Sequence, residues 1–390
     1  MKILFIFHEY NHTGATIVLY RNILWLKNNG IEPYLLITGH GSLENDIRKL
    51  GKSYNWHYED DIIDTSTLFG RIRRKIRKNF PKPKRYKKVL FEQLNNEKFD
   101  LIYANTICSS VYIKELGFLN KPVIWHLHEL ELAINLLGRE HLDIHDQVNC
   151  FIANSNATKS NLIKSHNIDG NKIIVHYPCI NITDIQLKKD DKFDIVKALS
   201  LPDDSFIIGT SGTVFSQKGS DAFFMLIRII EEIFPNNNFH YIWVGHNWIK
   251  FETDRDIELT GLKNKITFTG NLGNPVPYYQ SFDVFLSLSK QESFGLAAVE
   301  VSLLEKPIVF FDKTEGLSEI FSDKTGGEIP YLNLNVMANK LIELYKNPDL
   351  RKSLGKEARN IGEKFDENII MPELLKTITN IKNRSRKDAE

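Results

Sequence analysis

Short apolar runs alternate with amphipathic stretches along the whole chain. The runs KILFIF, EPYLLIT, LIYA, VIWHL, CFIA and KIIVH are rich in β-branched or aromatic residues and bounded by polar turns, which is typical of strands. The stretches between them have the period of helices. In the helix expected over TIVLYRNILWLKNNG, Gly30 offers a C-terminal cap. Its apolar stripe is expected to consist of Ile17, Leu19, Tyr20, Ile23 and Leu24.

The alternation restarts after a weak zone. Residues 181–204 are polar and lack a strand pattern, and new strands follow at FIIGT, YIWVG, ITFTG, VFLSLS and PIVFF. Alternating strands and helices predict parallel sheets with helices on both faces. We therefore expect an α/β protein of two doubly wound, Rossmann-like domains, residues 1–183 and 184–365, facing across a cleft. A helical segment, 366–390, is expected to pack back on the first domain.

Length and composition agree with this division. A chain of 390 residues exceeds the ~250–300 residues at which single cores stop growing. The three cysteines, Cys108, Cys150 and Cys179, show no CxxC or metal spacing and are expected to be buried free thiols in a reducing compartment. The first apolar run covers only Ile3 to Phe7, and no stretch reaches ~18 apolar residues. We expect a cytoplasmic protein.

The segment VFLSLSKQESFGLAAVEVSLLEKPIVF carries the most informative chemistry. A strand enters a polar loop, and a helix is expected to begin near Phe294, with Glu292 just before it and Glu300 in its second turn. Eight residues at ~1.5 Å rise span about 12 Å, roughly the length from a sugar ring across a diphosphate to a ribose. The free N–H groups of Phe294, Gly295 and Leu296 can face an anion at the positive helix end. Read alone, the two acids could equally be a surface acid and a helix-face acid.

This segment resembles the retaining glycosyltransferases of family four, which have the GT-B fold. Their signature is two glutamates separated by seven residues, with a Phe-Gly pair just after the first, and Glu292, Phe294, Gly295 and Glu300 match it. The resemblance implies that Glu292 binds hydroxyls of the donor sugar near the reaction centre. It implies that Glu300 binds the ribose hydroxyls of the nucleotide.

A second segment, FIIGTSGTVFSQKGSDAFFMLIRII, places Lys218 and Gly219 at the start of an expected helix. A lysine there can neutralise a diphosphate without a metal ion. The family usually carries Gly-Arg in this loop, with Lys-Gly five positions after the arginine. Here Gly212 is followed by Thr213, so the loop has one cation fewer, which a hydroxyl or another residue would have to replace. Taken alone, a Lys-Gly turn is a common loop.

Two further places resemble the family in the N-terminal half. After KILFIF, Gly14 precedes a helix and could reach the donor phosphates, although Thr13 stands where the family often has a first glycine. In KPVIWHLHEL, His126 and His128 share one face at a strand end. The family has a histidine close to the transferred sugar at this strand end, which implies that role for His128.

Other readings of these residues remain open. Gly14 could belong to an ordinary strand–helix turn, and His128 could be a structural histidine. A zinc site with His141 and His145 is the less favoured reading, because HLHE does not match HExxH and no cysteine joins it. The sequence contains no GxGxxG after its first strand and no GxxxxGK[ST], which disfavours a dinucleotide dehydrogenase and a P-loop NTPase.

The charge is unevenly distributed. Net charge is +1, yet residues 68–88 hold eleven Lys or Arg and no acid, which leaves 39 bases against 49 acids elsewhere. Apolar residues at three- and four-residue spacing within 68–80 indicate a basic amphipathic helix that can rest on anionic lipid. A solvated loop and a helix packed on its own domain are the alternatives. Nucleic acid is not expected as a partner, because the remaining surface is acidic.

These observations lead to one expected function. The chain is expected to be a retaining, metal-independent glycosyltransferase without a cofactor, moving a sugar from a nucleoside diphosphate sugar to a glycan or lipid-linked acceptor in bacterial polysaccharide or glycolipid synthesis. It would be cytoplasmic, with residues 68–88 as a contact to the inner face of the membrane. The expected reaction-centre residues are His128 and Glu292. The expected donor-binding residues are Gly14, Gly212, Thr213, Lys218, Gly219, Ser293, Phe294, Gly295, Leu296 and Glu300.

Two alternatives stay open. Another GT-B enzyme of nucleotide sugars, such as a 2-epimerase, would react without an acceptor. A non-catalytic partner subunit that keeps the fold is favoured only by Thr213 in the arginine's place.

Overall fold

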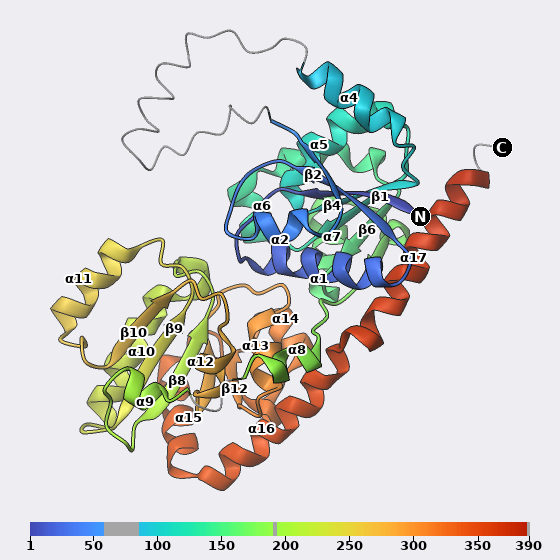
Figure 1. Ribbon diagram of the computed structural model, residues 1–390. Coiled ribbons are helices and arrows are strands. Elements are labelled where there is room, and N and C mark those ends of the chain that lie inside the picture. Colours follow the sequence, from blue (N-terminus) through green and yellow to red (C-terminus); the bar gives the residue numbers. More distant parts are fainter. Residues whose placement is uncertain (58–85, 190–192, 388–390) are drawn as a thin grey trace, which may run out of the picture. The chain divides into compact units, whose positions relative to one another are not determined.

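The chain divides into two compact units. The computed structural model describes residues 1–57, 86–189 and 193–387 (Figure 1). The first unit comprises residues 1–154 and 158–176 together with the chain from Met371 onward. The second comprises residues 155–157 and 177–370. Within the described residues, no helix combines the length and the apolarity needed to span a bilayer.

The first unit is built on a parallel sheet of seven strands in the order β3-β2-β1-β4-β5-β6-β7. The strands are β1 (Lys2–Phe7), β2 (Glu32–Ile37), β3 (Lys52–Asn55), β4 (Leu101–Asn105), β5 (Val123–Leu127), β6 (Cys150–Ala153) and β7 (Ile173–Val175). The strand order reverses between β1 and β4. In open α/β sheets, this switch point is where ligands bind, beyond the carboxyl ends of the strands.

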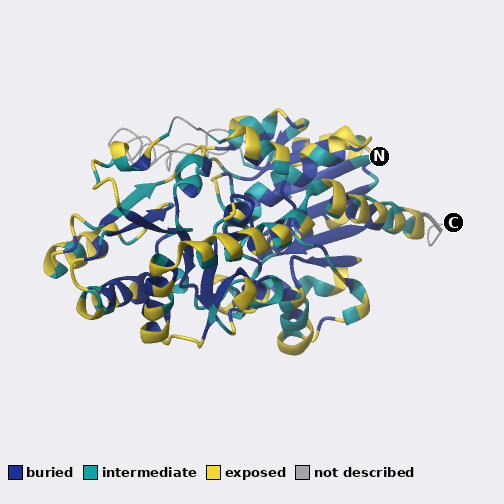
Figure 2. Ribbon diagram, turned by 90° about the horizontal axis from the view of Figure 1, so that it is seen from below, coloured by how far each residue is buried: buried dark blue, intermediate teal, exposed yellow. Residues whose placement is uncertain are grey.

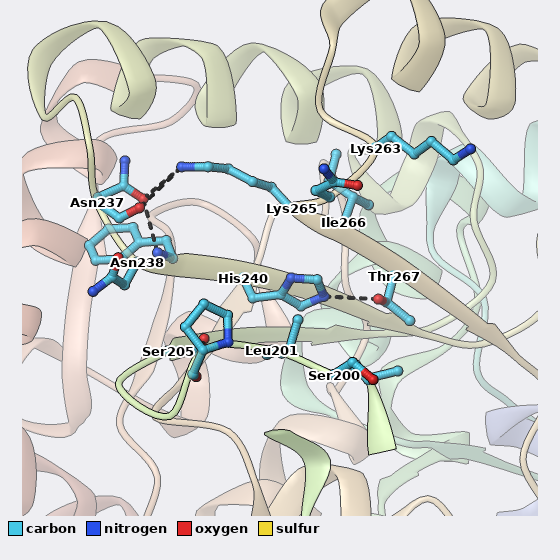
Figure 3. Close-up of a pocket in the computed structure, with 14 residues that line it drawn as sticks. Ser200, Leu201, Ser205, Asn237, Asn238, His240, Lys263, Lys265, Ile266 and Thr267 are labelled. Atoms are coloured by element: carbon cyan, nitrogen blue, oxygen red, sulfur yellow. Dashed lines mark hydrogen bonds between the residues drawn. The ribbon is translucent and has the colours of Figure 1, made fainter. Parts of the chain in front are cut away.

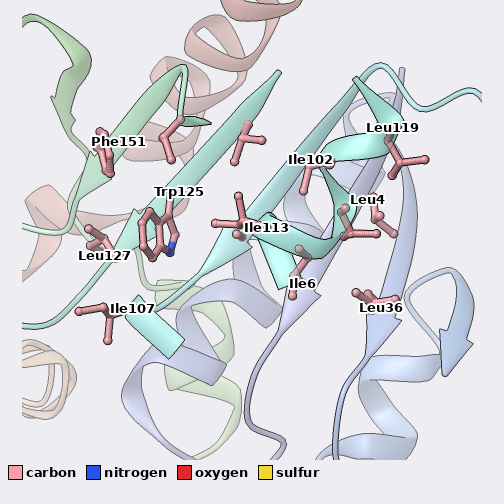
Figure 4. Close-up of a cluster of buried hydrophobic side chains, with 14 of the residues drawn as sticks. Leu4, Ile6, Leu36, Ile102, Ile107, Ile113, Leu119, Trp125, Leu127 and Phe151 are labelled. Atoms are coloured by element: carbon pink, nitrogen blue, oxygen red, sulfur yellow. The ribbon is translucent and has the colours of Figure 1, made fainter. Parts of the chain in front are cut away.

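Helices cover both faces of this sheet. They are α1 (Gly14–Asn28), α2 (Glu44–Arg48), α4 (Tyr86–Asn96), α5 (Ser110–Glu115), α6 (Glu131–Leu137), α7 (Asn156–His166) and α17 (Glu367–Lys387), with 3-10 helices η2 (Ile107–Ser109), η3 (Leu116–Leu119), η4 (Arg139–Gln147) and η5 (Gly170–Lys172). On one face Leu4, Ile6 and Trp125 join a cluster with Ile113 of α5 (Figure 4). Adjacent strand positions such as Phe5 are also fully buried, as expected for a parallel sheet covered on both sides.

The second unit is built on a parallel sheet of six strands in the order β10-β9-β8-β11-β12-β13, with its switch point between β8 and β11. The strands are β8 (Phe206–Ser211), β9 (Phe239–Val244), β10 (Ile266–Gly270), β11 (Val284–Ser287), β12 (Ile308–Phe311) and β13 (Gly326–Ile329). Its helices are α8 (Ile182–Leu187), α9 (Ile195–Ala198), α10 (Ser220–Ile233), α11 (Lys250–Thr260), α12 (Val276–Gln280), α13 (Leu296–Ser302), α14 (Gly316–Ile320), α15 (Leu334–Lys346) and α16 (Pro348–Gly362), with 3-10 helices η6 (Ser216–Lys218), η7 (Asp323–Thr325) and η8 (Glu363–Phe365).

Two apolar clusters sandwich this second sheet. Side chains of α10 and α15 pack with alternate residues of β8 and β9 on one face. Side chains of α12, α13 and α16 pack with the intervening residues on the other. Figure 2 shows the strands of each unit as buried and the outer faces of the helices as exposed. The core therefore packs both faces of the strands whose carboxyl ends carry the candidate residues.

The stripe expected on the first helix is wrong in part. Leu19 and Ile23 are buried, but Leu24 is exposed and Ile17 and Tyr20 are only partly buried. The buried face of α1 instead consists of Thr16, Val18, Leu19, Asn22, Ile23 and Leu26. Apolar residues also lie on the exposed side of this helix, so the spacing of its apolar residues does not show which face is buried. Gly30 follows the helix with a φ of +88°, as a capping glycine does.

Helix α17 contributes to the core of the first unit. Its side chains Met371, Leu374 and Ile378 are buried. Lys382 Nζ lies 3.0 Å from a carboxylate oxygen of Asp100, which directly precedes β4. All three cysteines are free thiols, of which Cys150 and Cys179 are buried and Cys108 is half-buried.

Candidate functional site

The candidate residues lie at the carboxyl ends of the strands beside the two switch points. In the second unit, Gly212 follows β8, and Glu292 lies in the loop that follows β11. In the first unit, Gly14 begins the helix that follows β1, and His128 directly follows β5. Parallel sheets leave strand ends and helix N-termini free at this edge, which is where α/β proteins bind ligands. Each of the two units contains one cluster of candidate residues.

The loop after β8 folds tightly around its lysine. Gly212 has a φ of +135°, and a Cβ added there would lie 3.4 Å from Cε of Lys218, so the lysine stem runs along this glycine. Gly219 has a φ of +78°, and a Cβ there would lie 2.1 Å from the carbonyl oxygen of Leu288. Only glycine allows this approach, because other residues would both clash and adopt a left-handed conformation. Helix α10 begins at the next residue, Ser220.

Lys218 and Glu292 form an ion pair across the switch point. Lys218 Nζ lies 2.5 Å from Oε2 of Glu292, and the side chains are 24% and 15% exposed. The hydroxyl of Ser289 donates to the same carboxylate oxygen at 3.2 Å. Both charged groups therefore remain accessible to solvent while holding each other. The sequence predicted both residues but not that they contact each other.

The turn between Glu292 and the following helix is built around a core residue. The Phe294 side chain is 2% exposed and packs against the rings of Tyr177 and Phe365, so it anchors the turn. Gly295 has a φ of +89°, and a Cβ there would lie 2.5 Å from Leu317. The Gly316 N–H donates to the Glu292 carbonyl at 2.8 Å. These contacts fix the backbone that presents the Glu292 carboxylate.

The helix begins later than expected. Helix α13 starts at Leu296 with Gly295 as its N-cap residue, and Ser293 and Phe294 precede it. The estimate of about 12 Å between Glu292 and Glu300 assumed uniform helical rise, so it does not apply to the non-helical part of the span. Glu300 lies within α13 and is 8% exposed.

A further cation, Lys290, contacts the loop that carries Lys218. Lys290 Nζ lies 2.6 Å from a carboxylate oxygen of Asp221 and 3.2 Å from the Ser216 hydroxyl. The backbone N–H of Lys290 donates to the Gln217 carbonyl at 2.8 Å. Lys290 therefore joins the loop after β11 to the loop after β8, and it is a candidate to replace the arginine absent at Thr213. The sequence signal was present, since Lys290 stands two residues before Glu292, but the pairing of the two loops was needed to recognise it.

In the first unit, helix α1 begins beside a polar turn. Gly14 has no atom within 4 Å of an added Cβ, so its backbone is open on that side. The Thr13 hydroxyl donates to the Glu9 carboxylate at 3.2 Å and lies 3.0 Å from the Thr16 hydroxyl. Thr13 thus replaces a glycine with a side chain that is held by its neighbours.

Histidines gather at the carboxyl ends of β5 and its neighbours. The rings of His126 and His128 stack at 4.1 Å, which confirms that they share a face. His176 lies edge-on to His126 at 6.2 Å. Burial lowers the pKa of His128 to about 3, and the pKa values of His8 and His176 to about 4, so their rings are neutral at pH 7. Neutral rings act as hydrogen-bond partners of fixed polarity rather than as charges.

Other features lie away from these clusters. A hollow of about 520 Å³ opens at the amino ends of β8, β9 and β10, where His240 donates to or accepts from Thr267 at 2.8 Å (Figure 3). None of the candidate site residues lines it. The basic segment 68–88 lies outside the described residues up to residue 85, so the structure does not bear on its expected membrane contact.

Models of two glycosyltransferase families match the two halves of the chain. The model described as "Glycosyltransferase Family 4" matches residues 12–184, and the model described as "Glycosyl transferases group 1" matches residues 191–361. The chain belongs to the group 1, family 4 glycosyltransferases. Members of this family have the GT-B fold, and the two parallel-sheet units of this glycosyltransferase agree with it.

Curated relatives match parts of this chain. A poly(ribitol-phosphate) α-N-acetylglucosaminyltransferase of Staphylococcus aureus is 30% identical over 156 residues, which are 39% of this chain and 31% of the relative. The capsular polysaccharide biosynthesis glycosyltransferase CapM of Staphylococcus aureus is 26% identical over 234 residues, which are 57% of this chain and 59% of the relative. The matches thus span about a third and somewhat more than half of these relatives.

Solved structures share the fold over nearly the whole chain. Anabaena HepE in complex with UDP and glucose superposes with a TM-score of 0.76 at 20% identity, covering 97% of this chain and 100% of that protein. A variant of S. aureus TarM, in complex with fondaparinux, α-GlcNAc-glycerol and UDP, gives a TM-score of 0.73 at 15% identity, covering 98% and 99%. At these identities the likeness establishes the fold of this glycosyltransferase, not its substrates.

Proposed function

We propose that this protein is a retaining glycosyltransferase that moves a sugar from a nucleoside diphosphate sugar to a hydroxyl of a glycan or lipid-linked acceptor. The bond between the sugar's anomeric carbon and the diphosphate oxygen breaks, and a bond to the acceptor oxygen forms on the same face. The acceptor's proton passes to the leaving diphosphate. The reaction serves bacterial polysaccharide or glycolipid synthesis in the cytoplasm.

The observation that carries this proposal is the Lys218–Glu292 pair at the switch point of the second unit. A solvent-accessible ammonium beside a helix N-terminus can stabilise the charge that develops on a leaving diphosphate. Glu292 would accept hydrogen bonds from hydroxyls of the donor sugar, and Glu300 would accept them from the ribose hydroxyls. Because Lys218 and backbone N–H groups supply the positive charge, the transfer would need no bound metal. His128, in the first unit, would contact the transferred sugar.

Related proteins support the donor and acceptor classes. The solved structures of HepE contain UDP, glucose or UDP-glucose, and the curated relatives are named for poly(ribitol-phosphate) glycosylation and for capsular polysaccharide biosynthesis. A uridine nucleotide sugar is therefore the first donor to test. The basic segment 68–88 supports contact with an anionic membrane surface, where lipid-linked acceptors are found.

A donor panel tests this proposal. UDP, GDP and ADP sugars are titrated into the protein with EDTA present, and both binding and donor consumption are followed. Glu300→Ala is expected to weaken binding of the matching nucleotide about tenfold or more, because a carboxylate that accepts ribose hydroxyls contributes about 1.5–3 kcal/mol per hydrogen bond. Glu343→Ala, which changes an exposed acid of α15 paired with Lys340, is the matched control and should bind as the wild type does.

The outcomes separate the alternatives. Binding and donor consumption that need an acceptor support the transferase. Donor consumption without an acceptor indicates an epimerase or a hydrolase. No binding at millimolar concentration refutes the proposal and favours a non-catalytic partner subunit, for which Thr213 in place of the arginine is the supporting residue.

A further inference from the structure

Asn105 occupies a buried position beside the histidine proposed to contact the sugar. It is the last residue of β4, which adjoins β1 at the switch point of the first unit, and its side chain is 1% exposed. Its side-chain oxygen lies 2.8 Å from Nε2 of His128. The family resemblance assigned no role to this residue, and sequence reasoning did not single it out.

The amide of Asn105 has only one orientation that satisfies its contacts. Its nitrogen Nδ2 donates to the Ala15 carbonyl of helix α1 at 3.0 Å. A carbonyl oxygen can only accept, so the NH2 group of Asn105 must face Ala15. The amide oxygen must therefore face His128. The positions of the amide oxygen and nitrogen are therefore assigned from the groups that they face.

The fixed amide determines which nitrogen of His128 carries the proton. A neutral imidazole has one N–H donor and one lone-pair acceptor. The Asn105 oxygen can only accept, so Nε2 of His128 must carry the proton. The other nitrogen, Nδ1, then holds the lone pair. Nδ1 makes no hydrogen bond to any residue that the structure describes, and it is not among the fully buried unpaired atoms.

The surroundings hold the ring in this state. His126 stacks on His128 at 4.1 Å, and the Tyr103 hydroxyl bonds Nδ1 of His126 at 2.9 Å, which keeps that ring in place. The His128 backbone N–H donates to the Glu129 carboxylate at 2.9 Å. Stacking on His126 thus holds the His128 ring in position, and the bond to Asn105 determines which of its nitrogens carries the proton.

We propose that Asn105 is a positioning residue that holds His128 as its Nε2–H tautomer, so that the Nδ1 lone pair accepts a hydrogen bond from a hydroxyl of the transferred sugar. The Asn105 amide links helix α1, which begins at Gly14, to His128, because its bond to Ala15 of that helix sets its orientation. The contact to sugar rests on the function proposed above. The tautomer itself does not, because it follows from the two hydrogen bonds of Asn105.

Nitrogen-15 NMR of histidine tests the tautomer without any substrate. In protein labelled with ¹⁵N-histidine, the two ring nitrogens of a neutral histidine have widely separated shifts that show which one is protonated. His128 is assigned by comparison with His128→Gln. We expect a single Nε2–H form in the wild type. In Asn105→Ala we expect either a mixture of tautomers or the Nδ1–H form. A wild-type ring protonated at Nδ1 would overturn the proposal.

Variants that keep or remove the acceptor give the functional test. Asn105→Ala should lower kcat on the order of 10–100-fold, as misplacing a group at the reacting centre does, with little change in the KM for the donor. Asn105→Asp keeps an oxygen toward Nε2 but has no N–H for the Ala15 carbonyl, so it should keep Nε2 protonated and lose part of the rate. Asn149→Ala, which removes an amide bound to the Val123 N–H at the opposite end of β5, controls for the loss of one structural hydrogen bond.

The two proposals fail in different ways. If no donor is turned over by wild-type protein while His128 is Nε2–H, the transferase proposal fails and the tautomer assignment stands. If the wild type is active and Asn105→Ala is equally active, Asn105 has no positioning role. If Asn105→Ala does not fold, the wild-type spectrum and Asn105→Asp still decide the tautomer.

Discussion

Replacing Lys218 by methionine tests the charge at the second switch point. Methionine keeps an unbranched stem against Gly212, so the change removes the ammonium with little loss of packing. A charge-assisted hydrogen bond contributes about 1.5–3 kcal/mol, which corresponds to about 10–150-fold in affinity. In the free protein this ammonium is already held by Glu292 at 2.5 Å. When the diphosphate binds, the ion pair with Glu292 must be broken, and this cost offsets part of the free energy of the new bond to the diphosphate. We therefore expect Lys218→Met to weaken nucleoside diphosphate binding about tenfold.

The partner variant should act in the opposite direction. Glu292→Gln removes the competing carboxylate, so the free diphosphate should bind as tightly as in the wild type or more tightly, while sugar transfer is lost. In Lys218→Met, the Glu292 charge would repel the diphosphate. The double variant should therefore bind better than Lys218→Met alone, with a coupling of about 0.5–3 kcal/mol between the two sites.

Calorimetry with EDTA present measures these affinities, using the nucleoside diphosphate of the donor selected by the panel. Lys265→Met is the matched control, because Lys265 forms a similar ion pair with Glu231 at 2.6 Å and is 27% exposed, but lies at the amino ends of the strands. It should leave the affinity unchanged. If Lys218→Met binds the diphosphate as tightly as the wild type, Lys218 does not contact it, and the assignment of the donor site is wrong.

Two further predictions concern stability. Gly219→Ala should lower the free energy of unfolding by more than about 2 kcal/mol in urea titrations, because its Cβ would lie 2.1 Å from the Leu288 carbonyl oxygen at a φ of +78°. Gly273→Ala, which has open space around it, should change little, and equal effects would contradict the argument. Burial lowers the pKa values of His8 and His176 from 6.5 to about 4. The unfolded chain therefore binds more protons as pH falls from 6.5 towards 4, and each histidine should cost about 1.4 kcal/mol of stability per pH unit there, an effect that His176→Asn should reduce.

The interior strands could be predicted from the sequence because both of their faces are buried. The runs ILFIF, within β1, and CFIA, which is β6, are apolar throughout, and each lies in a strand. The edge strands β3 (KSYN) and β13 (GGEI) were not predicted, since they are polar or glycine-rich and gain their regularity from one neighbouring strand. Local patterns do not record such pairing.

The candidate site shows the same limit. The loops that carry Lys218 and Glu292 could be found because their residues match a spacing within each segment. Their ion pair joins residues 74 positions apart, and the Asn105–His128 contact joins β4 to the end of β5. Both depend on strand order, which the sequence does not specify directly. The helix start at Leu296 differed because Gly295 takes a left-handed conformation that ends the preceding turn.

The use of both chain ends in the first unit has a consequence for biosynthesis. Met371, Leu374 and Ile378 are buried in this unit, so it can close only after the ribosome has made the chain to about residue 378. The second unit is complete once residue 370 has emerged. The usual order, in which N-terminal domains fold first during translation, should therefore be reversed. Until those residues emerge, the nascent first unit would expose apolar surface that chaperones recognise, and a fragment ending near residue 180 should not form a stable domain.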